Sequence, residues 1–142
     1  MNKVSAANAA LWELVEATFP EAVRLRNSES AKAFEGGDFV IAQMDDRDPE
    51  VLGVLSGGIC DLKLTPTLTF ALKGTSAERE AEVWEAVETL RLALAADVTL
   101  AGAVDDARLE GVEPAELEAA RYAAGGLDVL VRLLVTAPSK AG

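Results

Sequence analysis

Few residues of this 142-residue chain have the types and spacing that catalysis requires. Ser56 precedes Gly57 and Gly58, which would place a hydroxyl beside the backbone N–H groups of a tight turn. The sequence contains no histidine, so a Ser–His arrangement is impossible. A Ser–Lys arrangement would need the fold to bring a lysine such as Lys63 or Lys73 alongside. Because Gly-Gly pairs commonly form tight turns, we interpret this stretch as a turn.

Cysteine chemistry is equally limited. Cys60 is the one cysteine of the chain, so an internal disulfide and a cysteine cluster for zinc are both excluded. It has no histidine partner to activate it, and it stands at the start of an alternating apolar segment. Free cysteines are usually small, buried apolar side chains. The sequence therefore predicts no covalent intermediate, no transition metal and no cofactor.

The densest group of carboxylates is Asp45, Asp46, Asp48 and Glu50. Their oxygens are of the type that calcium and magnesium prefer. The spacing departs from the EF-hand loop, which also needs a glycine at its sixth position and a glutamate at its twelfth. We interpret the group as a solvated acidic turn, with a cation site as the alternative.

Composition limits the classes of partner. The chain has 13 basic and 24 acidic residues, a net charge of −11. Nucleic-acid binding needs a basic patch that releases counterions, so this balance argues against it. Half of the residues are apolar, enough to bury a core, and the length fits one domain over residues 1–142. No run of 18 apolar residues occurs, so we expect no membrane span.

The first segment with helical spacing lies at the N-terminus. Ser5 is its expected N-cap, and Pro20 should end it near Thr18, since the residue before proline disfavours the helical region. Its apolar stripe contains Leu11, Trp12, Val15 and Phe19.

A longer helix is expected over residues 74–97. Thr75 and Glu78 form the expected capping box at its start. Trp84 lies beside the apolar stripe and is expected to be a core or shielding residue. The stripe itself contains Val83, Val87, Leu90 and Leu94.

The remaining segments have strand-like patterns. Residues 59–73 alternate between apolar and polar side chains, as in an antiparallel strand with one wet face, and Pro66 should bend or split that strand. Residues 127–137 are apolar at nearly every position, which predicts a central strand covered on both faces. Shorter strands are expected at 22–26, 38–44, 51–58 and 103–113, and residues 137–142 should be flexible. The whole predicts an α+β domain: a mostly antiparallel sheet with an N-terminal helix and one long helix packed on one face.

The joint between the long helix and the strand that follows has three notable residues. Asp97 can cap or end the helix. Leu100 is expected to place an apolar side chain under the sheet. Gly102 is expected to need a backbone conformation that a Cβ would obstruct. We interpret the joint as structural and not as a catalytic loop.

The same joint resembles the C-terminal half of the tail terminator (tail completion) proteins of long-tailed bacteriophages. The order of elements is similar over most of the chain, and the residue-level similarity covers about twenty positions. It departs at Val98, where that family often has proline, and at Ala101, where a second glycine is common. The matching positions are Leu94, Asp97, Thr99, Leu100, Gly102, Val104, Asp106 and Arg108.

The resemblance implies a structural virion protein without catalysis. Such a protein would be assembled in the bacterial cytoplasm and would form a six-fold ring with copies of itself. The ring would cap the head-proximal end of the tail tube, contact the major tail tube protein and a neck or head-completion protein, and let DNA pass without specific binding. An acidic lumen would suit that passage; the first candidates for it are Asp45, Asp46, Asp48 and Glu50, and the second are Glu78, Glu82 and Glu85.

Two other classes fit the sequence. One is another head–tail connector or neck protein of similar α+β build, which composition does not separate from a terminator. The other is a small enzyme or ligand-binding domain, which would have to use carboxylate or lysine chemistry.

Overall fold

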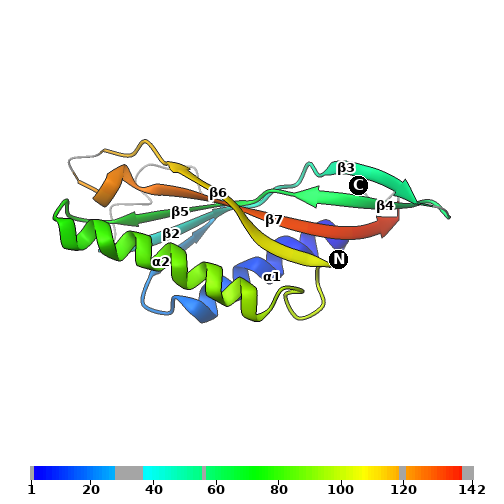
Figure 1. The fold of residues 1–142 in the computed structure, drawn as a ribbon, viewed down its shortest axis with the longest axis horizontal. Coiled ribbons are helices and arrows are strands. Elements are labelled where there is room, and N and C mark those ends of the chain that lie inside the picture. Colours follow the sequence, from blue (N-terminus) through cyan, green and yellow to red (C-terminus); the bar gives the residue numbers. More distant parts are fainter. Residues whose placement is uncertain (1, 28–36, 56, 119–120, 139–142) are drawn as a thin grey trace.

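The computed structural model describes residues 2–27, 37–55, 57–118 and 121–138. It has the predicted α+β architecture, a seven-stranded and mostly antiparallel sheet with both helices along one face. The molecule is elongated along the direction of its long central strands, and α1 and α2 lie below the sheet in Figure 1.

A long, kinked hairpin forms one half of the sheet. Its first half consists of strands β2 (Phe39–Met44) and β3 (Glu50–Leu55), and its second half, which runs back, consists of β4 (Ile59–Leu64) and β5 (Thr67–Leu72). β2 pairs with β5, and β3 pairs with β4. The predicted strand 59–73 is therefore split at Pro66 as expected, and its partner strand is interrupted opposite it, at residues 45–49.

Strand β7 (Leu127–Pro138) is the central strand of the sheet. β4 and β5 pair with successive parts of one side of β7, and β6 (Asp106–Pro114) pairs with its other side. Pro66 keeps the ladder continuous across the split, because its carbonyl oxygen accepts from the N–H of Val131 at 3.0 Å. β1 (Val23–Arg26) extends the sheet beside β2 as its one parallel pair among the described strands.

β7 and β6 differ from the sequence expectations in three respects. β7 continues through Ala137 and Pro138, which pair with Cys60 and Ile59. Ala137 ends the predicted strand as well as beginning the segment expected to be flexible, and Pro138 was expected to be flexible only. Residues 139–142 lie outside the described part. Alternate residues of β7 are buried and half-buried, because the helices cover one face only. β6 begins later than expected, because the turns at residues 98–105 precede it.

The helices end close to the predicted residues but begin at other residues and have other caps. α1 covers Lys3–Thr18, and its N-cap is Asn2, whose side chain accepts from the N–H of Ser5 at 2.7 Å. α2 covers Ala77–Ala96, and Ser76 caps it by accepting from the N–H of Arg79. The predicted caps at Ser5 and Thr75 are wrong by one to three positions, since several hydroxyl and amide side chains compete near each start.

The core lies between the sheet and the two helices. The apolar stripe predicted for α2 is buried in full, and each such side chain contributes about 1.5–3 kcal/mol to stability. Trp84 does not shield this core, because 51% of its surface is exposed. A second, smaller cluster on the other face is covered by the segment that contains the short 3-10 helix η2 (Ala123–Gly125). That cluster consists of Val40, Ala71 and Tyr122, with Leu25 and Leu117 packed against it.

Candidate assembly surface

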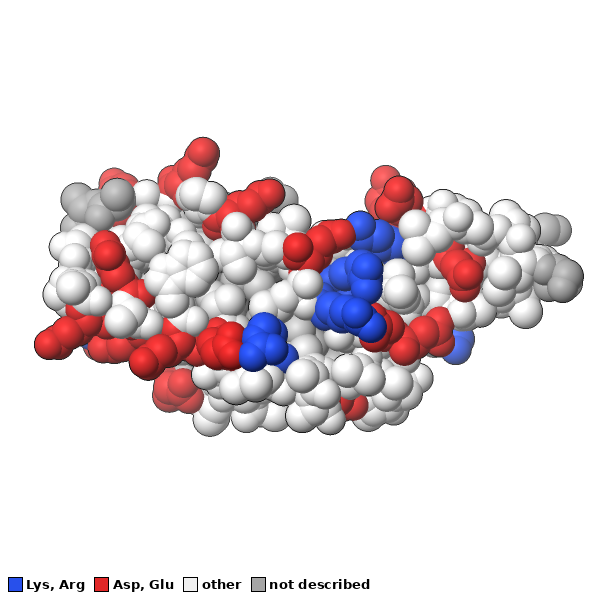
Figure 2. Space-filling model, in the orientation of Figure 1, with Lys and Arg blue, Asp and Glu red and all other residues white. Residues whose placement is uncertain are grey.

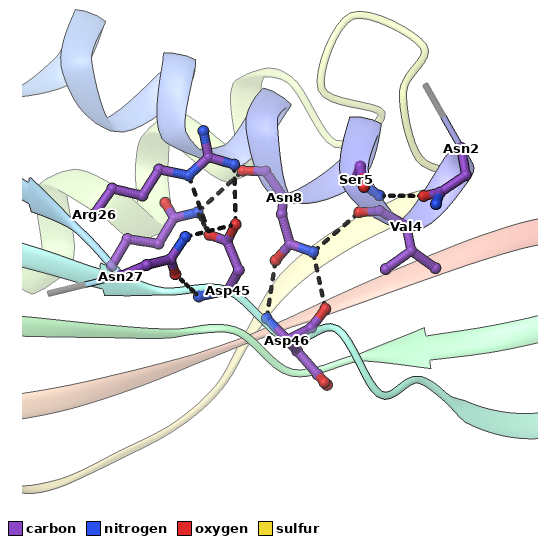
Figure 3. Close-up of polar contacts among 9 residues, drawn as sticks. Asn2, Val4, Ser5, Asn8, Arg26, Asn27, Asp45 and Asp46 are labelled. Atoms are coloured by element: carbon purple, nitrogen blue, oxygen red, sulfur yellow. Dashed lines mark hydrogen bonds and ion pairs between the residues drawn. The ribbon is translucent and has the colours of Figure 1, made fainter. Parts of the chain in front are cut away.

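The interruption between β2 and β3 is fastened to α1 by one buried side chain, Asn8 (Figure 3). Its amide nitrogen donates to the carbonyl oxygen of Asp46 at 2.9 Å and to that of Val4 at 3.0 Å. Its amide oxygen accepts from the N–H of Asp46 at 3.1 Å. Asn8 thus satisfies both backbone groups of a residue that no strand pairs, which fixes the kink relative to the helix.

The carboxylate of Asp45 is the centre of a second polar group at this kink. Arg26 donates to it through two nitrogens, at 3.0 and 3.2 Å, and Asn27 and Gln43 donate at 3.2 and 2.9 Å (Figure 3). Burial opposes ionisation of this carboxyl, but the hydrogen bonds from these three side chains outweigh burial and hold the pKa of Asp45 below its ordinary value.

Asp46 joins the two interruptions of the long hairpin. One of its carboxylate oxygens accepts from the N–H of Thr65, beside Pro66, at 2.8 Å, and the other accepts from the N–H of Asp48 at 3.0 Å. The acidic group singled out in the sequence is therefore divided. Asp45 and Asp46 are bonded within the chain, whereas Asp48 and Glu50 are exposed.

The joint after α2 is a tight left-handed turn. Asp97 ends the helix, and its carboxylate accepts from the N–H of Ala101 at 3.0 Å. Leu100, Ala101 and Gly102 have φ of +46°, +56° and +90°. The side chain of Leu100 is buried in the main core, so an unfavourable backbone conformation is retained where it delivers an apolar anchor.

The β3–β4 hairpin extends the sheet beyond the helices at one end of the molecule (Figure 1), and we call it the arm. Its outer strand, β3, carries large aliphatic side chains with an unusual degree of exposure. Val54 is 71% exposed and Val51 is 56% exposed. Leu52, Leu55 and Ile59 are also exposed. In the described part of the sheet, β3 pairs only with β4, so its other edge presents unpaired backbone groups.

The outer strand of the arm has aliphatic side chains on both faces. Val51 and Val54 stand opposite Leu62 and Cys60, which point toward the helices, whereas Leu55 stands opposite Ile59. An edge strand with one wet face normally alternates between apolar and polar residues, and a strand apolar on both faces is typical of a sheet interior. β3 thus has the composition of a central strand but lies at an edge of the sheet. Exposed apolar surface of this kind is typical of interaction sites.

Charge is distributed unevenly around the arm. Acidic residues follow α2 in Figure 2, whereas the surface at the arm end is largely uncharged. Three basic residues, Lys63, Arg108 and Arg132, lie on neighbouring strands β4, β6 and β7, with Arg108 directly opposite Arg132. Lys63 pairs with Glu110, while Arg108 and Arg132 contact Asp106 at 2.8 and 3.5 Å.

The residues considered for chemistry do not assemble into a site within the described part of the chain. Cys60 is buried in the core, and Ser56 lies outside the described residues. Gly57 and Gly58 have φ of +82° and +76°, as the interpretation of a glycine turn requires. No group of three or more potential metal-ligand residues occurs among the described residues, and no described helix is long and apolar enough to cross a membrane.

Sequence comparison adds no relative: no protein-family model and no curated protein sequence matches this chain.

Two features of this surface were missed in the sequence. Asn8 follows Val4 and precedes Leu11 at helical spacing, so a polar residue within an apolar stripe was the available signal. The exposure of the arm had no such signal, because the segment from Val51 to Leu55 is as apolar as a buried strand.

Proposed function

We propose that this protein is a structural protein of a phage-like tail that caps the head-proximal end of the tail tube. The observation that carries the proposal is the arm, whose outer strand β3 has exposed aliphatic side chains and, among the described strands, pairs along one edge only. Such a surface is suited to permanent assembly, since leaving it in water is unfavourable by about 25 cal/mol for each Å² of apolar area.

The resemblance at residues 94–108 supports the same proposal. The positions that carry it form a defined structural joint, in which Asp97 ends α2 and Gly102 has a positive φ. The joint orients α2 relative to β6 and has no group placed for catalysis. A ring of identical subunits would end tube growth if its head-proximal face does not bind the tail tube protein, so that no further tube layer can add to it.

Net charge supports passage of DNA without binding. A lumen lined with carboxylates repels phosphates, whereas a basic lumen would retain them through counterion release. Asp45 and Asp46 are already bonded within the chain, so the exposed Asp48 and Glu50 are the stronger lumen candidates of that group. Glu78, Glu82 and Glu85 of α2 are the alternative lining.

Electron microscopy of tails that carry this chain tests the proposal. We expect a closed ring, six-fold as the resemblance implies, at the head-proximal end of the tube, with acidic residues toward the channel. Density for this chain elsewhere in the neck would instead favour a connector protein. Absence of the chain from the particle would refute a structural role in the tail, and a lumen lined by Lys and Arg would refute the charge argument separately.

A further inference from the structure

The arm and a groove at the far edge of the same sheet have complementary properties. The groove lies between the C-terminal half of α2 and the start of β6, with a volume of about 310 Å³. Leu94, Ala95, Val98, Ala107 and Leu109 make its lining largely apolar, and Arg91 and Arg108 also line it.

We infer that the arm of one subunit docks into the α2–β6 groove of the next copy of this chain, an inference that rests on the proposed ring. A closed ring larger than a dimer needs a heterologous interface, in which one patch of each subunit meets a different patch of its neighbour. The arm therefore cannot be its own partner in such a ring. Its partner must be a second, complementary surface on the same chain.

Strand edges favour this groove. β3 needs a further edge to pair with, and β6 pairs within the described residues only with β7. β6 forms one wall of the groove, so its outer edge lies beside the apolar lining. Pairing of β3 with the neighbour's β6 would satisfy backbone groups on both edges and bring the aliphatic side chains of the arm against α2.

Charge distinguishes this groove from the other hollows that the structure describes. The arm has no charged residue from Val51 to Cys60, and its charged residues Glu50, Asp61 and Lys63 lie toward its base, where Glu50 stands opposite Lys63. A groove between α1 and the joint has Glu13 and Asp97 among its lining residues, and the hollow between α1 and α2 has Glu21, Glu82 and Glu85. The uncharged part of the arm would have to strip water from those carboxylates, which is unfavourable. In the α2–β6 groove, Arg91 and Arg108 already pair with Glu88 and Asp106, and the rest of the lining is apolar.

Disulfide trapping tests the pairing directly. Cys60 is replaced by Ala to leave no native thiol, and Val54→Cys is introduced on the arm in one preparation and Val98→Cys in the groove in another; both positions are exposed. Mixed under mild oxidation, the two preparations should form a covalent dimer, and each alone should form at least tenfold less. A chain with both substitutions should form a ladder of oligomers that closes at the ring size.

Trp84→Cys is the matched control, because it is exposed on the same helix but does not line the groove. Equal cross-linking of Val54→Cys with Trp84→Cys, self-linking of Val54→Cys alone, or no cross-linking at high protein concentration would overturn the inference. Circular dichroism confirms that each variant is folded. A ring seen by microscopy without the 54–98 bond would refute the groove and leave the proposed function standing. A specific ladder of oligomers linked between positions 54 and 98, in a protein that is absent from the tail, would support the groove and refute the proposed function.

Discussion

The amide of Asn8 should account for a measurable part of the stability of this protein. Asn8 is 1% exposed and bonds both the N–H and the carbonyl oxygen of Asp46. In Asn8→Ala both Asp46 groups lose their partner, and each such loss costs about 1–3 kcal/mol, with the low end applying because Asp46 is only partly buried. The better helix propensity of alanine returns about 0.5 kcal/mol. Two losses of about 1–1.5 kcal/mol each, less about 0.5 kcal/mol, give an expected net loss of about 1.5–2.5 kcal/mol.

Urea unfolding followed by circular dichroism measures this loss. Glu16→Ala is the control, because Glu16 lies on the exposed side of the same helix, and its free energy of unfolding should change by about 0.5 kcal/mol or less. In thermal unfolding the Asn8→Ala midpoint should fall by about 5–10 °C. If Asn8→Ala unfolds within about 0.5 kcal/mol of the unmodified protein, the kink does not depend on these bonds and the reasoning is refuted.

A second substitution separates the bonds from the shape of the side chain. Asn8→Asp keeps an oxygen to accept from the N–H of Asp46 but replaces the donor that faced its carbonyl oxygen with a carboxylate oxygen. Two acceptors then oppose each other in a buried position, so at neutral pH the variant should lose at least as much stability as Asn8→Ala. In mildly acidic solution the introduced carboxyl becomes protonated and can donate again, so the difference from the unmodified protein at the same pH should shrink. A pH-independent difference would contradict this interpretation.

Three further expectations concern other parts of the chain. Gly102→Val should lower the free energy of unfolding in urea by about 1–3 kcal/mol, because φ at Gly102 is +90°, although a Cβ there would meet open space. Gly111→Val is the control, at an equally open position without positive φ, and should change the free energy of unfolding by less than about 0.5 kcal/mol. Equal effects of the two substitutions would contradict backbone strain at Gly102. Because the pKa of Asp45 is lowered in the folded protein, its carboxylate stabilises the fold above the ordinary carboxyl pKa, and this stabilisation is lost as pH falls through the folded-state pKa. The difference in free energy of unfolding between the unmodified protein and Asp45→Asn should therefore become smaller at acidic pH. A difference that does not change with pH would contradict this role of Asp45. Elemental analysis of purified protein should find no stoichiometric zinc or iron, since histidine is absent and cysteine is single; a stoichiometric metal would overturn this expectation.

The helices, the strands and their buried faces followed from local patterns in the sequence. Val83, Val87, Leu90 and Leu94 recur at helical spacing and are all buried, because a helix on a sheet has one stripe to cover. Alternation over residues 59–73 likewise predicted a strand with one buried face that bends or splits at Pro66, since period two and a missing N–H are local properties of the chain.

Which apolar and acidic residues remain exposed depends on tertiary packing. β3 is as apolar as an interior strand, yet it is exposed because the described helices do not cover the arm. Periodicity shows which residues of a strand lie on the same face. It does not show whether a helix or another strand covers that face. Asp45 and Asp46 were interpreted as part of a solvated turn, but Arg26 and Thr65, distant in sequence, bond them. Partners of that kind are set by how the kinked hairpin packs against α1, and no local pattern encodes them.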